Sequence, residues 1–308
     1  MQLVFFGSSG FSVPILEALS SEHHLLAVVT QPDRPRGRGR RPQPTPVKSW
    51  AKERGFLVLE PEDLGEIKAE LERMHPEAFV VAAYGKILPR WLLDLPPYGA
   101  INVHPSLLPR YRGAAPIQWA ILKGERETGV TTFLMDEGLD SGPILLQRRV
   151  PIGEEETASE LSRRLSELGS ELTLETLRGL QQGRIRPRPQ DHQKACYAPK
   201  IERRHGLIHW QEAAGRILNL IRALDPWPSA YTFYRGKLLK IWRARVGWGK
   251  GRAGEVIGLE GGIEVACGEG SLIIGELQLE GKRRMGAEEF LRGHPLRVGE
   301  KLGGGEGT

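Results

Sequence analysis

Two polar side chains that could do chemistry, Asn102 and His104, stand at the end of an apolar run that begins at Gly99. Because successive side chains of a strand point to opposite faces, the two should project the same way while Val103 packs behind them. Ligands of open α/β sheets bind beyond the carboxyl ends of the strands, where this pair would lie. An amide and an imidazole aimed at one point can stabilise a developing oxyanion, and the imidazole can also move a proton. The competing interpretation is a strand-end turn whose polar side chains are simply hydrogen-bonded.

An acid that could orient this imidazole is found in the segment FLMDEGLDSGPIL, residues 133–145. It offers Asp136, Glu137 and Asp140 in a loop between two expected strands, with glycines that permit sharp turns. A carboxylate beside His104 would set the orientation of its ring and accept a proton, directly or through water. For any one of these acids taken alone, a solvated turn is the competing interpretation.

A basic loop follows the second expected strand. Residues 31–46, QPDRPRGRGRRPQPTP, carry many arginines among prolines and glycines, with Asp33 as the acidic residue. The arginines are Arg34, Arg36, Arg38, Arg40 and Arg41. Their mutual repulsion predicts an exposed loop that can meet an anion, although a solvated basic loop without a partner is the usual alternative. The net charge of +5 favours a polyanionic partner only modestly.

Composition restricts the class of protein. The chain has 308 residues, 40% hydrophobic and 26% charged, which is ordinary for a globular protein and long enough for two domains. It has no apolar run of about eighteen residues, and its first residues lack the segments of a secretory signal. We therefore expect a cytoplasmic protein with no membrane partner. The two cysteines, Cys196 and Cys267, are far apart and suggest neither a disulfide framework nor a metal site.

The first half of the chain predicts a mostly parallel sheet. Continuous apolar runs, typical of strands buried on both faces, alternate with amphipathic segments at residues 11–20 and 62–74. The expected strands are residues 3–7, 25–30, 79–84 and 100–103, followed by a pair at 129–135 and 143–150. A long helix over residues 157–181 should follow, opened by the capping-box spacing of Thr157 and Glu160. We expect a Rossmann-like α/β domain over residues 1–182.

The composition changes after this helix. Residues 183–206 contain prolines, many charges and few apolar positions, which predicts a basic linker. Beyond it, a helix over residues 213–224 and glycine-punctuated alternating strands predict a small OB-like β-barrel over residues 207–308. We expect Trp227 and Trp242 to lie in its core, because both stand in apolar contexts.

The opening motif carries a resemblance to a known family. The segment NVHPSLLPRYRG resembles the N-x-H and SLLPxxRG motifs of the enzymes that transfer formyl groups from 10-formyltetrahydrofolate, and residues 136–142 are similar to their D-x-G-x-D-x-G loop. The similarity continues in order through GSSGF, TQPDRPRGRGRRPQPTPVK, AAYGKILP and IRALDPWPSAY. Pro105 stands where some members carry glycine or alanine, and GSSGF stands where GTPxF is common. Neither departure replaces a catalytic group.

By position, the resemblance implies that Asn102, His104 and Asp140 are the catalytic residues. It implies that 10-formyltetrahydrofolate is the formyl donor, that no metal is needed, and that the acceptor is the α-amino group of methionyl initiator tRNA. The folate-binding residues that it implies are Tyr84, Gly85, Ile87, Leu88, Pro89, Ser106, Leu107, Leu108 and Pro109. For Leu107 and Leu108, an interpretation as plain core residues stays open.

The resemblance also implies where the tRNA binds. The acceptor stem should meet the arginines of residues 31–46. In the linker, Arg184, Arg186, Lys194 and Lys200 could line a nucleic-acid path, although a charged linker kept soluble accounts for them equally well. We expect the chain to act as a monomer.

Other functions remain as alternatives. A formyltransferase for a nucleotide-linked amine would share the first-domain chemistry but would not need a basic second domain. A nucleic-acid-binding protein with a vestigial enzyme domain is disfavoured, because Asn102, His104 and Asp140 are all present. A dinucleotide site is disfavoured as well, since Ser9 stands where a G-x-G-x-x-G fingerprint needs glycine.

Overall fold

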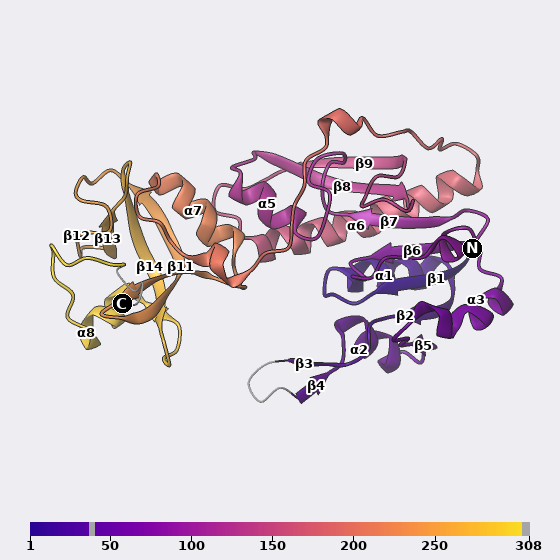
Figure 1. Ribbon diagram of the computed structural model, residues 1–308, viewed down its shortest axis with the longest axis horizontal. Helices are drawn as coiled ribbons and strands as arrows, with labels where there is room; N and C mark the ends of the chain where they lie inside the picture. Colours follow the sequence, from indigo (N-terminus) through magenta and orange to yellow (C-terminus); the bar gives the residue numbers. More distant parts are fainter. Residues whose placement is uncertain (37–40, 304–308) are drawn as a thin grey trace. The chain divides into compact units, whose positions relative to one another are not determined.

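The computed structural model describes residues 1–36 and 41–303 and divides the chain into two compact units (Figure 1). The first unit comprises Met1–Pro116, Glu127–Pro151 and Ser162–Pro199, and the second comprises Ile117–Arg126, Ile152–Leu161 and Lys200–Thr308. The expected linker, residues 183–206, is therefore shared between the two units. Within the described ranges, no helix is long and apolar enough to cross a membrane.

A seven-stranded sheet with the order β5-β2-β1-β6-β7-β8-β9 forms the centre of the first unit. Its strands are β1 (Gln2–Gly7), β2 (His24–Val29), β5 (Val58–Leu59), β6 (Ala78–Ala82), β7 (Ala100–His104), β8 (Glu127–Leu134) and β9 (Ile144–Pro151). The strands from β5 to β7 run parallel, whereas β8 is antiparallel to both β7 and β9. The predicted mostly parallel sheet is confirmed.

Helices cover both faces of this sheet (Figure 1). On one face lie α1 (Ser12–Glu22) and α6 (Ala158–Gln181). The two helices pack closely on the sheet and on each other. A methyl group added at Gly169 of α6 would lie only 3.2 Å from Val103 of β7 and 3.5 Å from Ile15 of α1. The opposite face is covered by η1 (Leu64–Ile67), α3 (Lys68–Met74) and α4 (Arg90–Leu93). Ala100 of β7 belongs to the core cluster on that side. By strand alternation Asn102 and His104 share this face.

Local signals explain where the helices begin and end. The backbone N–H of Thr157 donates to Glu160 at 2.9 Å and that of Glu160 donates to the Thr157 hydroxyl at 3.3 Å, so the predicted capping box at the start of α6 is confirmed. The segment expected to be amphipathic over residues 62–74 is a 3-10 turn capped by Asp63, followed by α3. It ends at His75, whose φ of 48° is left-handed.

The second unit contains a six-stranded antiparallel sheet with the order β10-β11-β14-β13-β12, in which β15 pairs with β14. Its strands are β10 (Ala230–Tyr234), β11 (Lys237–Gly247), β12 (Val256–Gly258), β13 (Ile263–Ala266), β14 (Ser271–Leu279) and β15 (Met285–Gly286). The helices α7 (Ala214–Ala223) and α8 (Ala287–Gly293) contribute Ile217, Ile221 and Phe290 to its core. The predicted small barrel is a curled half-barrel of antiparallel strands (Figure 1).

Neither of the two tryptophans expected in this core belongs to its buried cluster. Trp227 is 54% exposed, so that prediction is wrong. Trp242 is half-buried, and Lys240 and Arg284 lie over its ring at 5.5 and 5.0 Å from the centroid. Trp227 lies in the turn between α7 and β10, and an apolar sequence context does not say whether a turn residue is covered by the core.

Tyr84 buries a polar atom in the core of the first unit. Its side chain is 2% exposed and meets the ring of Phe6 edge to face, and its hydroxyl has no hydrogen-bond partner among the described residues. Burial raises the pKa of this hydroxyl from 10.0 to about 12. The folded state resists ionisation of this hydroxyl. The stability that depends on its neutral form is therefore complete below pH 10 and is lost as the pH rises toward 12.

We expect Tyr84→Phe to leave the free energy of unfolding at pH 7 unchanged or to raise it by up to about 1 kcal/mol, because an unsatisfied hydroxyl is removed. Between pH 10 and pH 12 the variant should lose about 2 kcal/mol less stability than the parent chain. Urea unfolding across this pH range measures both effects. Tyr197→Phe, at a residue 63% exposed, is the control that should show neither. A clear loss of stability at pH 7 in Tyr84→Phe would show that the hydroxyl has a partner.

Candidate active site

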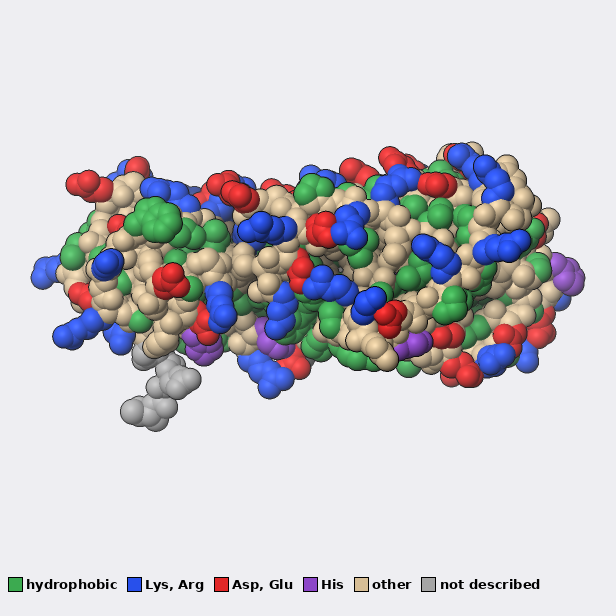
Figure 2. All heavy atoms as spheres, turned by 90° about the horizontal axis from the view of Figure 1, so that it is seen from above, with side chains coloured by type: hydrophobic (Ala, Val, Ile, Leu, Met, Phe, Trp, Pro, Cys, Tyr) green, Lys and Arg blue, Asp and Glu red, His purple; other side chains and the backbone are tan. Residues whose placement is uncertain are grey.

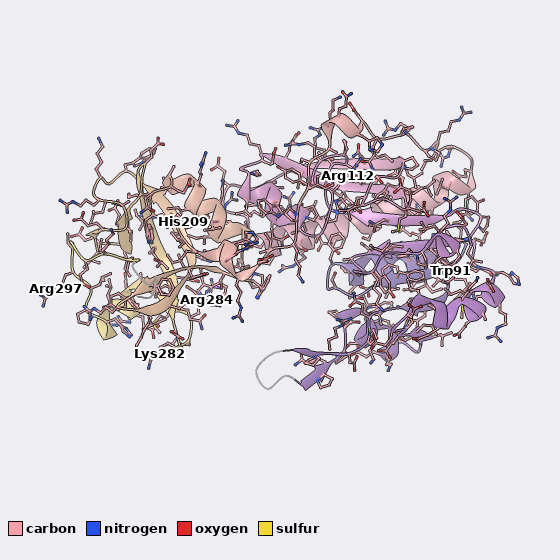
Figure 3. The ribbon with its side chains drawn as sticks, in the orientation of Figure 1. Trp91, Arg112, His209, Lys282, Arg284 and Arg297 are labelled. Atoms are coloured by element: carbon pink, nitrogen blue, oxygen red, sulfur yellow. The ribbon has the colours of Figure 1, made fainter. Side chains whose placement is uncertain are left out.

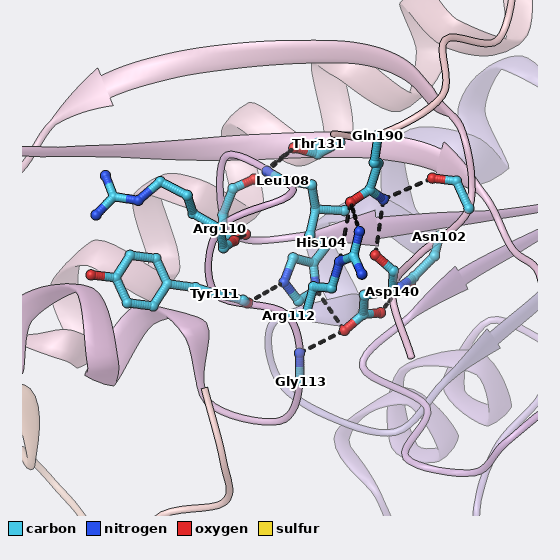
Figure 4. A network of polar contacts seen from close by, with 12 residues as sticks. Asn102, His104, Leu108, Arg110, Tyr111, Arg112, Gly113, Thr131, Asp140 and Gln190 are labelled. Carbon is cyan, nitrogen blue, oxygen red and sulfur yellow. Dashed lines mark hydrogen bonds and ion pairs between the residues drawn. The ribbon is translucent and has the colours of Figure 1, made fainter. Parts of the chain in front are cut away.

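Three polar side chains from two separate segments converge in the first unit. Asn102 and His104 lie at the end of β7, and Asp140 comes from the loop between β8 and β9. The Asn102 Nδ2 lies 3.5 Å from the Asp140 Oδ1, and the His104 Nδ1 lies 3.7 Å from the Asp140 Oδ2 (Figure 4). All three line one cavity of about 530 Å³. The shared face predicted for Asn102 and His104 is therefore present, and Asp140 is the acid that reaches them.

The ring of His104 is fixed by a backbone carbonyl. Its side chain is 5% exposed, and its Nε2 lies 2.9 Å from the carbonyl oxygen of Tyr111. Since a carbonyl oxygen can only accept, Nε2 carries the hydrogen and donates it. The second nitrogen, Nδ1, faces Asp140 and is the one left for exchange with a ligand in the cavity. Phe133 supports the ring from the side, with centroids 6.5 Å apart.

Asp140 reaches the site from the opposite end of the sheet. Because β8 is antiparallel to β7, the loop that follows β8 starts beside Ala100, whose carbonyl accepts from the Met135 N–H at 2.8 Å, and must fold back over the sheet. Asp140 has a φ of 49°, a left-handed conformation that is uncommon for a non-glycine residue. Its Oδ2 accepts a hydrogen bond from the Gly113 N–H at 2.7 Å. A third chain segment thus holds the carboxylate in place.

Two loops form the walls of the cavity. One runs from Ala83 to Leu88 and the other from Asp136 to Asp140. Large apolar side chains stand exposed on both loops, Ile87 at 86% and Leu139 at 59%. Such exposure in a concave, mostly apolar site is typical of a surface that a ligand covers. Of the residues predicted to bind folate, Tyr84, Gly85, Ile87 and Leu88 line this cavity.

The other predicted folate residues, Ser106–Pro109 and Pro89, lie outside the lining and make different contacts. The Ser106 carbonyl accepts from the Thr131 hydroxyl at 2.7 Å, and the Leu108 carbonyl accepts from Gln147 at 2.8 Å. Leu108 packs with Phe133 in a small core cluster. This turn is fastened to β8 and β9 and supports the strand end that carries His104. Pro89 precedes the first residue of α4.

Two residues of the site were not singled out from the sequence. Arg112 is 4% exposed and Gln190 is 5% exposed, and together they connect the segment after β7 to the loop that carries Asp140 (Figure 4). Figure 3 shows Arg112 among the elements of the first unit, whereas the exposed Lys282 and Arg297 extend outward from the second. A glutamine in a charged, proline-rich segment gives no sign in the sequence that it is buried. For Arg112, the signal that could have drawn attention was its place in the RYRG part of the opening motif.

The base of the arginine loop adjoins the cavity. A smaller cavity of about 220 Å³ is lined by Gln31, Arg34 and Thr45, among others, and it shares Tyr84 and Gly85 with the larger one. The side-chain amide of Gln31 donates to the Tyr84 carbonyl at 2.7 Å. The carboxyl end of β2 is therefore joined to the wall of the larger cavity.

The basic residues predicted to bind tRNA are only partly described. Arg34 is exposed on β3 (Arg34–Arg36), whose backbone pairs with β4 (Arg41–Gln43), while Arg38 and Arg40 lie outside the described residues. The basic residues of the expected linker, Arg184, Arg186, Lys194 and Lys200, are all exposed. Lys194 is paired with Asp191 at 2.9 Å. Figure 2 shows Lys and Arg side chains mixed with Asp and Glu over the face that it presents, so charge alone does not outline an interface there.

No group of three or more His, Cys, Asp or Glu side chains in the described parts of the chain is arranged to hold a metal ion. The polar groups that the site does bring together are an amide, an imidazole and a carboxylate around one cavity.

The sequence matches known proteins over nearly its whole length. Residues 1–177 match the family described as formyl transferase, and residues 200–295 match its C-terminal domain. The chain is 51% identical over 306 residues to a protein of Pelobacter propionicus named methionyl-tRNA formyltransferase, with 98% of this chain and 96% of that protein covered. A protein of the same name from Caldanaerobacter subterraneus subsp. tengcongensis is 50% identical over 308 residues, with 98% and 100% covered.

Solved structures share the fold at lower identity. The structure of HypX from Aquifex aeolicus in complex with tetrahydrofolic acid is 20% identical, with a TM-score of 0.66 over 98% of this chain and 50% of that one. The N-formyltransferase from Helicobacter canadensis in complex with folinic acid and dTDP-3-aminofucose is 22% identical, with a TM-score of 0.68 over 88% of this chain and 97% of that one. At these identities the likeness concerns the fold.

Gly113 is required at its position by two independent features. Its φ of 113° is left-handed, and an added Cβ would lie 2.9 Å from the carbonyl oxygen of Ala198. We expect Gly113→Ala to lower the free energy of unfolding by about 1–3 kcal/mol, measured by urea denaturation. Gly10→Ala is the matched control, because a methyl group there meets nothing within 4 Å. Equal stability of the two variants would contradict the constraint.

Proposed function

Because the chain belongs to the formyl transferase family, we propose that it transfers the formyl group of 10-formyltetrahydrofolate to the α-amino group of methionyl initiator tRNA. The product is formylmethionyl-tRNA for translation initiation. Relatives about 50% identical over almost the full chain bear the name of this activity. The observation that carries the proposal is the convergence of Asn102, His104 and Asp140 on a cavity of about 530 Å³, which suits a bound small-molecule donor.

The reaction needs an oxyanion donor and a path for one proton. The unprotonated α-amine attacks the formyl carbon, so that a new C–N bond forms and negative charge develops on the formyl oxygen. Asn102 donates to this oxygen from Nδ2, and His104 in its protonated form donates from Nδ1, because its Nε2 is committed to Tyr111. As the bond to N10 of the folate breaks, the proton lost by the amine passes to N10. Asp140 holds the imidazole and takes part in that transfer.

The donor is proposed to lie between the two loop walls of the cavity. Its flat pterin presents hydrogen-bonding edges that backbone groups of Tyr84–Leu88 can read, and the exposed Ile87 and Leu139 would be covered by its apolar parts. Ser106–Pro109 would support the donor site without lining it, since the Ser106 and Leu108 carbonyls already accept hydrogen bonds from β8 and β9. The folate-binding role of this turn stays a prediction.

The acceptor is proposed to enter past the arginine loop. The supporting observation is that Arg34 lines the smaller cavity, which shares Tyr84 and Gly85 with the larger one. An exposed guanidinium at this place can pair with the phosphate groups near the aminoacylated end of tRNA. The amine would then meet the formyl carbon at the edge of the cavity where Asn102 lies.

The test uses labelled 10-formyltetrahydrofolate with three competing acceptors: methionyl initiator tRNA, methionyl elongator tRNA and glycinamide ribonucleotide. We expect label in the initiator tRNA. Label in glycinamide ribonucleotide alone would identify an enzyme for a nucleotide-linked amine and would overturn the proposal, as would an absence of transfer to either tRNA.

Asn102→Ala should lower kcat roughly a hundredfold or more, because one oxyanion donor is lost in the transition state. The KM for the folate donor should change by less than about threefold, since the donor interacts mainly with the walls of the cavity. Steady-state formylation at saturating tRNA measures both constants. The other asparagine of the chain, Asn219, is the matched control, and Asn219→Ala should keep kcat within twofold. Turnover near that of the parent chain in Asn102→Ala would remove the assigned role.

Arg34→Ala should raise the KM for charged tRNA several-fold at low salt and leave kcat at saturating tRNA unchanged. It should also reduce the slope of log KM against log salt concentration by about one unit, as expected for one lost phosphate contact. Arg73→Ala on α3 is the control, because that exposed side chain bonds to the Ala69 carbonyl at 3.2 Å. Identical salt slopes for the two variants would exclude Arg34 from the tRNA contact.

A further inference from the structure

Gln190 is a buried amide whose hydrogen-bonding groups are fully used around the loop of Asp140. It is 5% exposed, and its Nε2 donates to the carbonyl oxygens of Asp140 at 2.9 Å and Gly142 at 2.7 Å (Figure 4). An amide nitrogen has two hydrogens, so both are committed. These bonds cross 50 and 48 positions of sequence, so they do not arise from the local chain.

Arg112 decides which way this amide faces. Its side chain donates from Nε and Nη2 to the Gln190 Oε1 at 3.2 and 2.7 Å, and Nη2 also contacts the His192 Nδ1 at 3.2 Å. A guanidinium has no acceptor, so the oxygen of the amide must face Arg112 and the nitrogen must face the loop. Arg112 is itself 4% exposed and is held by the Cys196 carbonyl, which accepts from its N–H at 2.9 Å.

The same short segment therefore acts on the catalytic groups twice. The backbone of Tyr111 and Gly113 contacts His104 and Asp140 directly, and the side chain between them acts on Asp140 through Gln190. Asp140 has a left-handed φ of 49°, which is uncommon outside glycine, and this second anchor helps to hold its backbone.

We propose that Gln190 is a positioning residue for the formyl transfer: held by Arg112, it fixes the backbone of Asp140 so that the carboxylate faces His104 and Asn102. The proposal rests on the proposed function and adds a residue to it. Gln190 is not among the described residues that line the cavity, so it is placed to act on the site through Asp140. Its loss should therefore affect kcat and spare the KM values, unlike the loss of a binding residue.

The test compares two identical chemical changes in one segment. Gln190→Glu keeps the shape and the bond to Arg112 but replaces two donations by repulsion between oxygens. Gln193→Glu, at an exposed position three residues on, is the matched control. We expect Gln190→Glu to lower kcat at least tenfold with both KM values within about threefold, and Gln193→Glu to match the parent chain.

A measurement independent of activity separates positioning from general stability. The Gly113 amide proton, observed by selective labelling of arginine and glycine, reports the bond to the Asp140 carboxylate. It should shift in Gln190→Glu and stay in place in Gln193→Glu, in folded samples of both. If the parent chain transfers no formyl group, the proposed function fails, while the Gly113 signal still tests whether Gln190 positions Asp140.

A second variant covers the case in which the glutamate variant does not fold. Gln190→Met removes both donations without adding charge and should also lower kcat at least tenfold. Because Arg112 acts through Gln190, the double variant with Arg112→Met should lose about as much as the larger single loss rather than the product of the two. A kcat within twofold of the parent, a change confined to KM, an unmoved Gly113 signal, or multiplicative losses would each overturn the proposal.

Discussion

The backbone of Tyr111–Gly113 is the constraint on which the candidate site depends. Its carbonyl at Tyr111 accepts from His104 at 2.9 Å, and its N–H at Gly113 donates to Asp140 at 2.7 Å. Backbone groups have one fixed role each, as donor or acceptor, so they set the tautomer of the imidazole and the direction of the carboxylate together. A side chain in either place could turn away, whereas a backbone group moves only if the segment moves.

This segment can hold its shape because another part of the chain is paired with it. The Ala198 N–H donates to the Arg112 carbonyl at 2.7 Å, and the Ala115 N–H donates to the Ala198 carbonyl at 3.1 Å. The approach is so close that only glycine fits at position 113. Residues between 188 and 199 thus hold this segment of the site in place. The same stretch of chain carries exposed charged side chains and a buried glutamine.

The topology of the sheet explains why the site gathers groups from both directions. In a purely parallel sheet, the loop that follows each strand would lie at the same edge, beyond the carboxyl ends of the strands. Here β8 runs antiparallel to β7, so its following loop starts at the far end and returns over the face that carries Asn102 and His104. The returning loop forms one wall of the cavity, which Phe133 and Met135 also line. An open strand end thereby becomes a pocket with two walls.

The sequence by itself determined six of the seven strands in the sheet of the first unit, the capping box of α6 and the shared face of Asn102 and His104, because periods of two and 3.6 residues are properties of neighbouring residues. The resemblance then indicated Asp140 and the donor. Only the tertiary structure decided how Asp140 reaches His104, which of the predicted folate residues line the cavity, and that Gln190 is buried against Arg112. These facts depend on contacts between residues 27 to 78 positions apart, and no local pattern of residue types encodes such a distance.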